Sequence, residues 1–450
     1  MSNPSIPGSL APAVRVSLAA FVLASAACLC RTLPPALVLL PLLAVVPLWW
    51  LFRHPVGSLG VVLAIMPFHF MAVMLGQFFG LPHVDLISGL TKEIPLLILA
   101  AILLWRNGFR PTTADWFLAC CLGVAVLRTA IGGTLSGLRN DFEFVLPYLV
   151  GRVTVLSCAQ QKRWAIWAVW IAAVVSFAGV VEVYVLGPAP RRLLYALVST
   201  DLVSTSSDRL PNAFYATGLD GLRAASTMIG PPSLAALCMI ALILWWAYMR
   251  NPIPAAAVCL GLVFSLTRSA WIGLVVAICM IASRMKQSHR LAAYAAVALV
   301  GFIALIPVLG LSDYLSLSRS GQDPSEQSHR ENEASGVSYV YNHPFGAGAG
   351  GTGPVAAESN ANALVIENTY LEFAAEYGAV SAMCFLGFLI SATVNAWRYR
   401  EPLGYAAFGI LVGVGLMMAV LLMHEDFRLA CWVWFPVGLL LRRERVSGND

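Results

Sequence analysis

Charged residues are scarce in this chain. Only 11% of its 450 residues are Asp, Glu, Lys or Arg, whereas soluble globular domains carry about 25%. No basic cluster is longer than the tail segment Arg442, Arg443, Glu444 and Arg445, so the net charge of +5 does not indicate nucleic-acid binding. These absences exclude an ordinary soluble domain and argue against nucleic acid as a partner.

Recognisable metal and nucleotide signatures are missing as well. The ten cysteines lie in or beside apolar segments and show neither zinc-ligand spacing nor a disulfide framework. There is no Asp-x-Asp pair, and the glycine-rich stretch at 341–353 lacks the Lys-Ser/Thr ending of a P-loop. The sequence therefore predicts no metal ligands and no cofactor, and the glycine-rich stretch is either a flexible or a closely packed loop.

Long apolar stretches fill most of the chain. Hydrophobic residues make up 59% of it and the mean hydropathy is +0.77. Because a helix crosses a bilayer with about 20 mostly apolar residues, we predict an all-α, polytopic transmembrane bundle of about 12–14 spans. The candidate spans are 14–30, 33–52, 56–79, 86–105, 114–131, 141–158, 164–187, 233–249, 252–266, 269–283, 291–310, 377–397, 403–423 and 427–441. The weakest are 86–105 and 141–158, where tilted, broken or re-entrant helices are the alternatives.

The basic residues predict the orientation. If both termini are cytoplasmic, more than half of the Lys and Arg residues fall on the inner side, mainly in short connections, as the positive-inside rule requires. Two long polar segments then face the periplasm. The expected parts are an N-terminal transmembrane bundle at 1–187, a first long periplasmic loop at 188–232, central spans at 233–310, a large periplasmic loop at 311–376, and C-terminal spans with a cytoplasmic tail at 377–450.

Two arginines stand near the expected outer ends of spans. Arg268 lies between two apolar runs, where an arginine needs a carboxylate, backbone carbonyls or an anionic ligand as its partner. An interfacial anchor or an internal ion pair is the alternative. Arg223 precedes the span that begins near Ser233, and an arginine beside a helix N-terminus can help to bind phosphate. A solvated loop arginine is the alternative there.

The large loop adds further polar candidates. His329 and Arg330 precede the glycine-rich stretch, and Arg330 is either an anion-binding or a solvated side chain. Glu367 stands at or near the start of a helix expected within residues 367–383. A carboxylate at that position is favoured by the helix dipole, so capping is one interpretation of Glu367. The other is a general base at the boundary between water and membrane.

The order of these features resembles the O-antigen ligase and polysaccharide polymerase family of bacterial inner-membrane glycosyltransferases. SLTRSAW at 265–271 is similar to the family's Ser-x-Ser-Arg motif, and HPFGAGAG at 343–350 is similar to its Pro-x-x-Gly-x-Gly segment. ENTYLEFAAEYG at 367–378 is similar to His-Asn-x-Tyr-Leu followed by Glu-x-Gly. The family's ligases have His where this chain has Glu367, and this departure favours a polymerase.

The resemblance implies a GT-C-like fold and an inverting glycosyl transfer that requires no metal. The donor would be a glycan on undecaprenyl pyrophosphate at the periplasmic face. The acceptor would be a glycan or a lipid-linked glycan, and a chain-length regulator is a candidate partner. Arg268 and Arg330, with Arg223, would bind the pyrophosphate, and Glu367 would orient or deprotonate the acceptor hydroxyl. The further candidates for substrate binding are Asn368, Tyr370, His329 and His343.

Two other functions remain open at this point. A ligase would join a finished glycan to a different acceptor. A lipid-linked oligosaccharide transporter would tend to place its charged residues along a central cavity, whereas here the notable charges gather in the two outward loops. That distribution favours chemistry at the membrane surface over transport.

Overall fold

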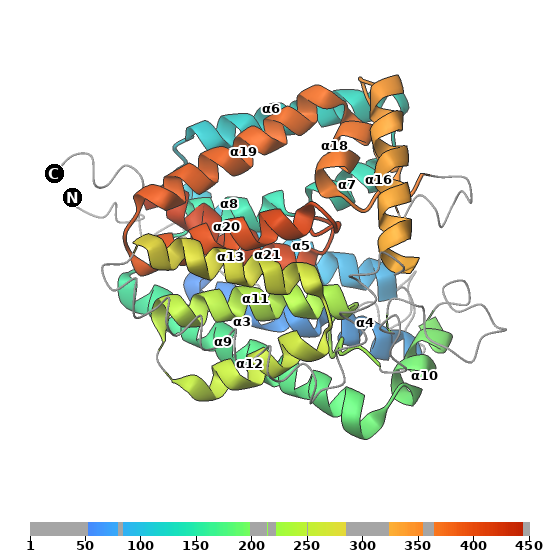
Figure 1. Ribbon diagram of the computed structural model, residues 1–450. Helices are drawn as coiled ribbons and strands as arrows, with labels where there is room; N and C mark the ends of the chain where they lie inside the picture. The colour runs from blue at the N-terminus through green and yellow to red at the C-terminus, as the bar shows by residue number, and fades with distance from the viewer. Residues whose placement is uncertain are drawn as a thin grey trace, which may run out of the picture. The chain divides into compact units, whose positions relative to one another are not determined.

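The computed structural model describes residues 53–79, 84–198, 214, 222–249, 251–284, 324–353 and 364–443. These residues are predominantly helical (Figure 1), and the only β-type pairing within them is an isolated bridge between Thr352 and Leu364. The prediction of an all-α fold is therefore confirmed.

The helices within these ranges have the following bounds. In chain order they are α3 Pro55–Ile65, η1 Met66–Phe68, α4 His69–Phe78, α5 Val84–Asn107, α6 Thr113–Gly132, α7 Leu135–Phe142, α8 Val145–Val153, α9 Cys158–Val181, η2 Glu182–Leu186, α10 Ala189–Val198, α11 Pro231–Tyr248, α12 Pro252–Phe264, α13 Arg268–Arg284, α16 Pro324–Asn342, α18 Thr369–Tyr377, α19 Ala379–Arg398, α20 Pro402–Met418 and α21 Phe427–Arg443.

Several of these segments can cross a membrane. By length and composition, the described residues contain five such spans, namely Pro55–Gln77, Thr113–Gly132, Cys158–Leu186, Pro231–Tyr248 and Ala379–Arg398. The shorter α12 and α20 are also apolar. Each of the seven coincides with an expected span, so the chain is a multi-pass membrane protein. The expected spans 14–30, 33–52 and 291–310 lie outside the described residues, and the total number of spans stays a prediction.

The two weak spans behave differently. The segment 86–105 lies within the single helix α5, although Pro95 is inside it. The segment 141–158 is broken, because α7 ends at Phe142, α8 ends at Val153 and α9 begins only at Cys158. Arg152, near the end of α8, is buried and donates to both carboxylate oxygens of Asp115, at 3.0 and 2.8 Å. This pairing satisfies a buried charge that would otherwise be costly.

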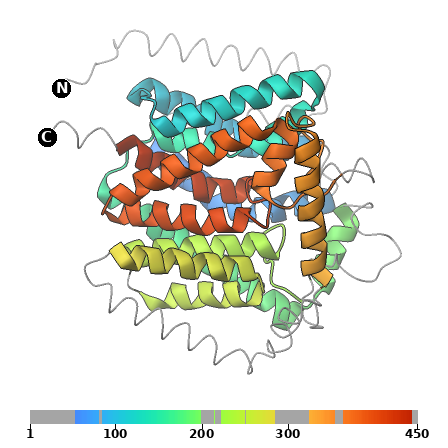
Figure 2. The same cartoon turned by 45° about the horizontal axis from the view of Figure 1, so that its top comes forward.

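An aromatic core fixes α18 against neighbouring helices. Phe373 of α18 stacks on Phe385 of α19 with ring centroids 4.4 Å apart, and its edge meets Phe142 of α7 at 5.5 Å. Such pairs add to the hydrophobic burial of large rings. α16 in turn packs against α18, and Figures 1 and 2 show it running across the ends of the longer helices. Both described helices of the predicted large loop, α16 and α18, therefore have defined positions on the bundle.

Candidate functional site

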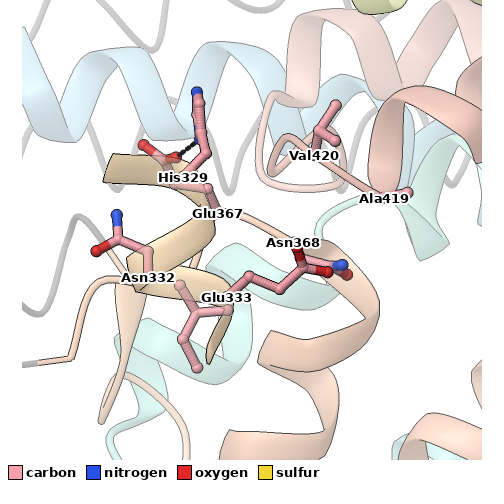
Figure 3. A pocket seen from close by; sticks show the side chains of 8 residues that line it. His329, Asn332, Glu333, Glu367, Asn368, Ala419 and Val420 are labelled. Atoms are coloured by element: carbon pink, nitrogen blue, oxygen red, sulfur yellow. Dashed lines mark ion pairs between the residues drawn. The ribbon is translucent and has the colours of Figure 1, made fainter. Parts of the chain in front are cut away.

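A small, open pocket with a cavity volume of about 30 Å³ lies between α16, the start of α18 and the connection after α20. His329 and Glu367 form an ion pair within it (Figure 3), through His329 Nδ1 and Glu367 Oε2. Their side chains are 43% and 35% exposed, so a substrate can reach both. The structure thus brings together three of the candidate residues from the sequence, because Asn368 lines the pocket with His329 and Glu367. The other lining residues are Asn332, Glu333, Ile366, Asn368, Ala419 and Val420.

Asn368, and not Glu367, caps the following helix. The Asn368 side-chain oxygen accepts hydrogen bonds from the backbone amides of Tyr370 at 3.0 Å and Leu371 at 3.2 Å. Asn is among the best residues at this position because it satisfies amides that the helix leaves without partners. The capping interpretation of Glu367 therefore loses its basis, and the Glu367 carboxylate faces His329 one residue before the cap.

Tyr370 anchors the same helix to the bundle. Its hydroxyl donates to the carbonyl oxygen of Gly415 in α20 at 2.7 Å. Burial raises the pKa of Tyr370 to about 12. This contact gives the Tyr370 hydroxyl a structural partner within the chain. The expected role of Tyr370 in substrate binding stays a prediction.

Arg223 fixes the turn that precedes Arg268. Its Nε donates to the carbonyl oxygen of Ser265 at 3.0 Å, and its Nη2 donates to the Thr267 hydroxyl at 3.0 Å. Leu266, between those two residues, has a φ of 50°, which is unusual for a branched side chain. The arginine thus holds a strained turn, and Arg268 follows as the first residue of α13. The two arginines that the sequence singled out upstream of the large loop belong to one local structure.

The remaining candidates, Arg330 and His343, lie far apart along the direction of α16. Arg330 is exposed beside His329, whereas His343 follows the last residue of the helix and stacks on Tyr339 with ring centroids 4.3 Å apart. At a rise of about 1.5 Å per residue, His343 lies about 20 Å along the helix axis from His329. His343 is therefore remote from the pocket. That Arg268 and Arg330 converge on one anionic ligand stays a prediction.

The glycine-rich stretch is a closely packed loop that surrounds one of the chain's own carboxylates. Glu376 accepts hydrogen bonds from the Gly350 amide at 3.0 Å, the Thr352 amide at 3.0 Å and the Thr352 hydroxyl at 3.1 Å. Gly348 has a φ of 106°, and a Cβ there would come within 2.5 Å of the Gly132 carbonyl oxygen. Glycine is therefore required for the backbone conformation and for the contact with α6. Of the two interpretations from the sequence, the packed loop is confirmed.

A buried acidic cluster lies next to this loop. It combines Asp141 of α7, Glu372 and Glu376 of α18, and Glu425 beside the fully buried His424 in the connection between α20 and α21. Burial and the nearby Glu376 raise the pKa of Asp141 well above its usual range and that of Glu425 to about 7. Burial lowers the pKa of His424 to about 3. Ligand atoms of Asp141, His424 and Glu425 all lie within 4.8 Å of one another, so these residues could hold a metal ion.

Sequence reasoning missed this cluster because its members are far apart in the chain. The one local signal is the triplet His424, Glu425 and Asp426 between two apolar helices, where polar residues are costly unless they have partners. Local motifs predict no metal ligands in this chain, because the cluster is assembled by segments that are far apart in the sequence.

Comparison with known proteins adds one match. Residues 253–386 match a family model described as O-antigen ligase. The matched range begins in α12 and ends in α19, so it contains Arg268, His329, Arg330 and Glu367, while Arg223 precedes it. No curated protein matches the chain.

Proposed function

We propose that the chain polymerises lipid-linked oligosaccharide repeat units, on the basis of its match over residues 253–386 to a family model described as O-antigen ligase. The product would be an exopolysaccharide or an O-antigen. The donor would be an undecaprenyl-pyrophosphate glycan, presented at the periplasmic face of a bacterial inner membrane. The observation that carries the glycosyl transfer in this proposal is the ion pair of His329 and Glu367 in an accessible pocket within the matched range.

In the proposed reaction, Glu367 is the general base. Its carboxylate takes the proton of the acceptor hydroxyl while that oxygen bonds to the anomeric carbon of the donor. The bond from the anomeric carbon to the pyrophosphate oxygen breaks, and the lipid pyrophosphate leaves with the electron pair. Attack from the side opposite the leaving group inverts the anomeric carbon. His329 holds the Glu367 carboxylate in place across the pocket, which is the usual task of a partner that orients a base.

The arginines serve the leaving group. Arg268 is the first residue of α13. The positive end of the helix dipole at this position favours an anionic ligand beside the Arg268 guanidinium. A pyrophosphate at this position would be favoured by both the guanidinium and the helix end. Arg223 acts as a positioning residue, since its guanidinium binds the backbone and hydroxyl of the preceding turn. Arg330 stands beside His329 and would contribute from α16.

A ligase is the second candidate, because the matched family is described by that activity. The two functions differ in their products. Purified protein in lipid vesicles, supplied with lipid-linked repeat units alone, should give a ladder of chain lengths if it is a polymerase. A ligase should give no ladder from this mixture and should need a second acceptor.

The same assay tests the arginines. Arg268→Ala and Arg330→Ala should each abolish the ladder while protein level and melting temperature stay unchanged. Lysine at either position should restore little activity, because an ammonium lacks the planar fork that matches two phosphate oxygens. The matched control is Arg400→Ala, which removes an exposed arginine from the connection between α19 and α20. A normal ladder from Arg268→Ala would remove that residue from the mechanism.

A further inference from the structure

The acidic cluster lies directly behind the pocket. Thr369, which follows the pocket residue Asn368, donates its hydroxyl to the carbonyl oxygen of Leu421 at 2.9 Å. His424 Nδ1 lies 3.3 Å from the same hydroxyl. Ala419 and Val420 of this connection line the pocket. Whatever holds the cluster together therefore also fixes two walls of the pocket.

The cluster carries more acidic groups than nearby cations can balance. Four carboxyl groups, from Asp141, Glu372, Glu376 and Glu425, lie within mutual electrostatic range and are largely or fully buried. Cations on the neighbouring described segments have other partners. Lys92 pairs with Glu143, Arg139 with Glu93 and Arg428 with Asp426, while Arg128 donates to the carbonyl oxygen of Gly346. Buried charges without a counterion are strongly unfavourable, so the cluster requires bound protons or a bound cation.

Two buried atoms point to a cation. Glu372 Oε2 and His424 Nε2 belong to side chains that are almost completely buried, and neither atom has a hydrogen-bond partner within the described ranges. They lie 3.4 Å apart. Of the two residues, His424 belongs to the group whose ligand atoms lie within 4.8 Å of one another, so its imidazole nitrogen offers a ligand position that no hydrogen bond of the described residues uses. The Glu372 carboxylate adds negative charge beside it.

We propose that Asp141, His424 and Glu425 bind a divalent transition-metal ion such as Zn²⁺ or Mn²⁺. The donor set decides the class of metal, because imidazole nitrogen suits zinc and other transition metals, whereas Mg²⁺ and Ca²⁺ prefer oxygen alone. The Tyr377 hydroxyl donates to Asp141 Oδ2, and such a second contact orients a ligating carboxylate.

This ion has a structural role, separate from the glycosyl transfer. It joins α7 to the 419–426 connection behind the pocket, and the proposed chemistry at Glu367 does not pass through it. The site could therefore exist even if the proposed function is wrong. Conversely, the absence of a metal would leave the proposed polymerase reaction intact.

The test is the metal content and thermal stability of the full-length protein in detergent. Protein purified without chelators from cells supplied with Zn²⁺ and Mn²⁺ should hold about one of these ions per chain by mass spectrometry of the elements. Asp141→Asn and Glu425→Gln should each lose it. Outer-shell partners alone contribute about 10–100-fold to metal affinity, so loss of a ligand should cost at least about 100-fold. The matched control, Glu401→Gln, changes an exposed acid at a helix connection and should keep the ion.

A second measurement does not depend on the folding of variants. Excess EDTA captures a buried ion when the protein unfolds, so it should lower the melting temperature of the wild type. The same chelator should leave the melting temperature of Glu425→Gln unchanged. The proposal is overturned if the wild type carries no stoichiometric metal and melts identically with and without EDTA. If neither protein binds metal and Glu425→Gln melts at a higher temperature than the wild type, the carboxyl groups of the cluster share protons and bind no ion.

Discussion

Replacement of Glu367 by glutamine separates the catalytic from the structural interpretation of this residue. The substitution keeps the size and shape of the side chain and removes its basicity. General-base assistance contributes about 10²–10⁴-fold to a rate, which corresponds to about 2.7–5.4 kcal/mol in the activation free energy. We therefore expect Glu367→Gln to lower the rate of polymer formation by at least about 10²-fold.

The structure predicts a much smaller effect on stability. The ion pair between Glu367 and His329 is partly exposed on both sides, and such pairs contribute about 0–1 kcal/mol to the free energy of unfolding. Asn368 supplies the helix cap, so the substitution leaves the start of α18 intact. Activity and stability should therefore respond to Glu367→Gln on clearly different scales.

The assay is the rate at which purified lipid-linked repeat units are converted to longer chains, with melting temperature as the check on folding. Glu331→Gln is the matched control, because it makes the same change at an exposed position of α16. Glu367→Asp should retain part of the activity. Wild-type polymerisation by Glu367→Gln would refute the general-base role and require the acceptor to be activated elsewhere.

Three further outcomes follow from the structure. Arg223→Ala should lower the rate of polymer formation by about 10–100-fold. The turn at Ser265 and Thr267 would lose the guanidinium that positions Arg268. Misplacement of a catalytic group by about 1 Å can lower a rate by about 10²-fold. Glu376→Gln should lower the free energy of unfolding by about 1.5–3 kcal/mol, measured by thermal melting, because an amide cannot accept all the hydrogen bonds of the glycine-rich loop. A reporter fused near Gly336 should be active only outside the cytoplasm, and cytoplasmic activity would overturn the expected orientation.

The membrane spans were predictable because each depends on local composition. The broken segment at 141–158 shows the limit of that approach. Its overall hydropathy resembles a span, yet it contains the end of α7, the short α8 and a non-helical link before α9. Pro147 and Arg152 lie in α8, and Arg152 pairs with Asp115 of α6. A hydropathy average over a window of residues does not detect such breaks. It also cannot include Asp115, the partner of Arg152, which lies more than thirty residues away in the sequence.

The candidate site was predictable in part. The segment from Glu367 to Gly378 resembles a family pattern as a string of residues, but the string does not show what each residue contacts. The structure separates these tasks: Glu367 faces the pocket, Asn368 caps the helix and Glu376 holds the glycine-rich loop. The contacts that distinguish the residues come from other segments, so no local pattern could assign them.

The pairing of Glu367 with His329 also changes the meaning of the departure from the family pattern. The sequence alone indicates that an imidazole has been lost at position 367, and this loss favours a polymerase over a ligase. In the structure an imidazole is still present at the same place, because His329 reaches it from α16. Glu367 therefore adds a carboxylate to a site that keeps its histidine. Since both proton-accepting groups occupy one pocket, the residue at 367 carries less weight in choosing between the two activities than the sequence indicates. The choice rests instead on the acceptor, which only the product of the reaction can identify.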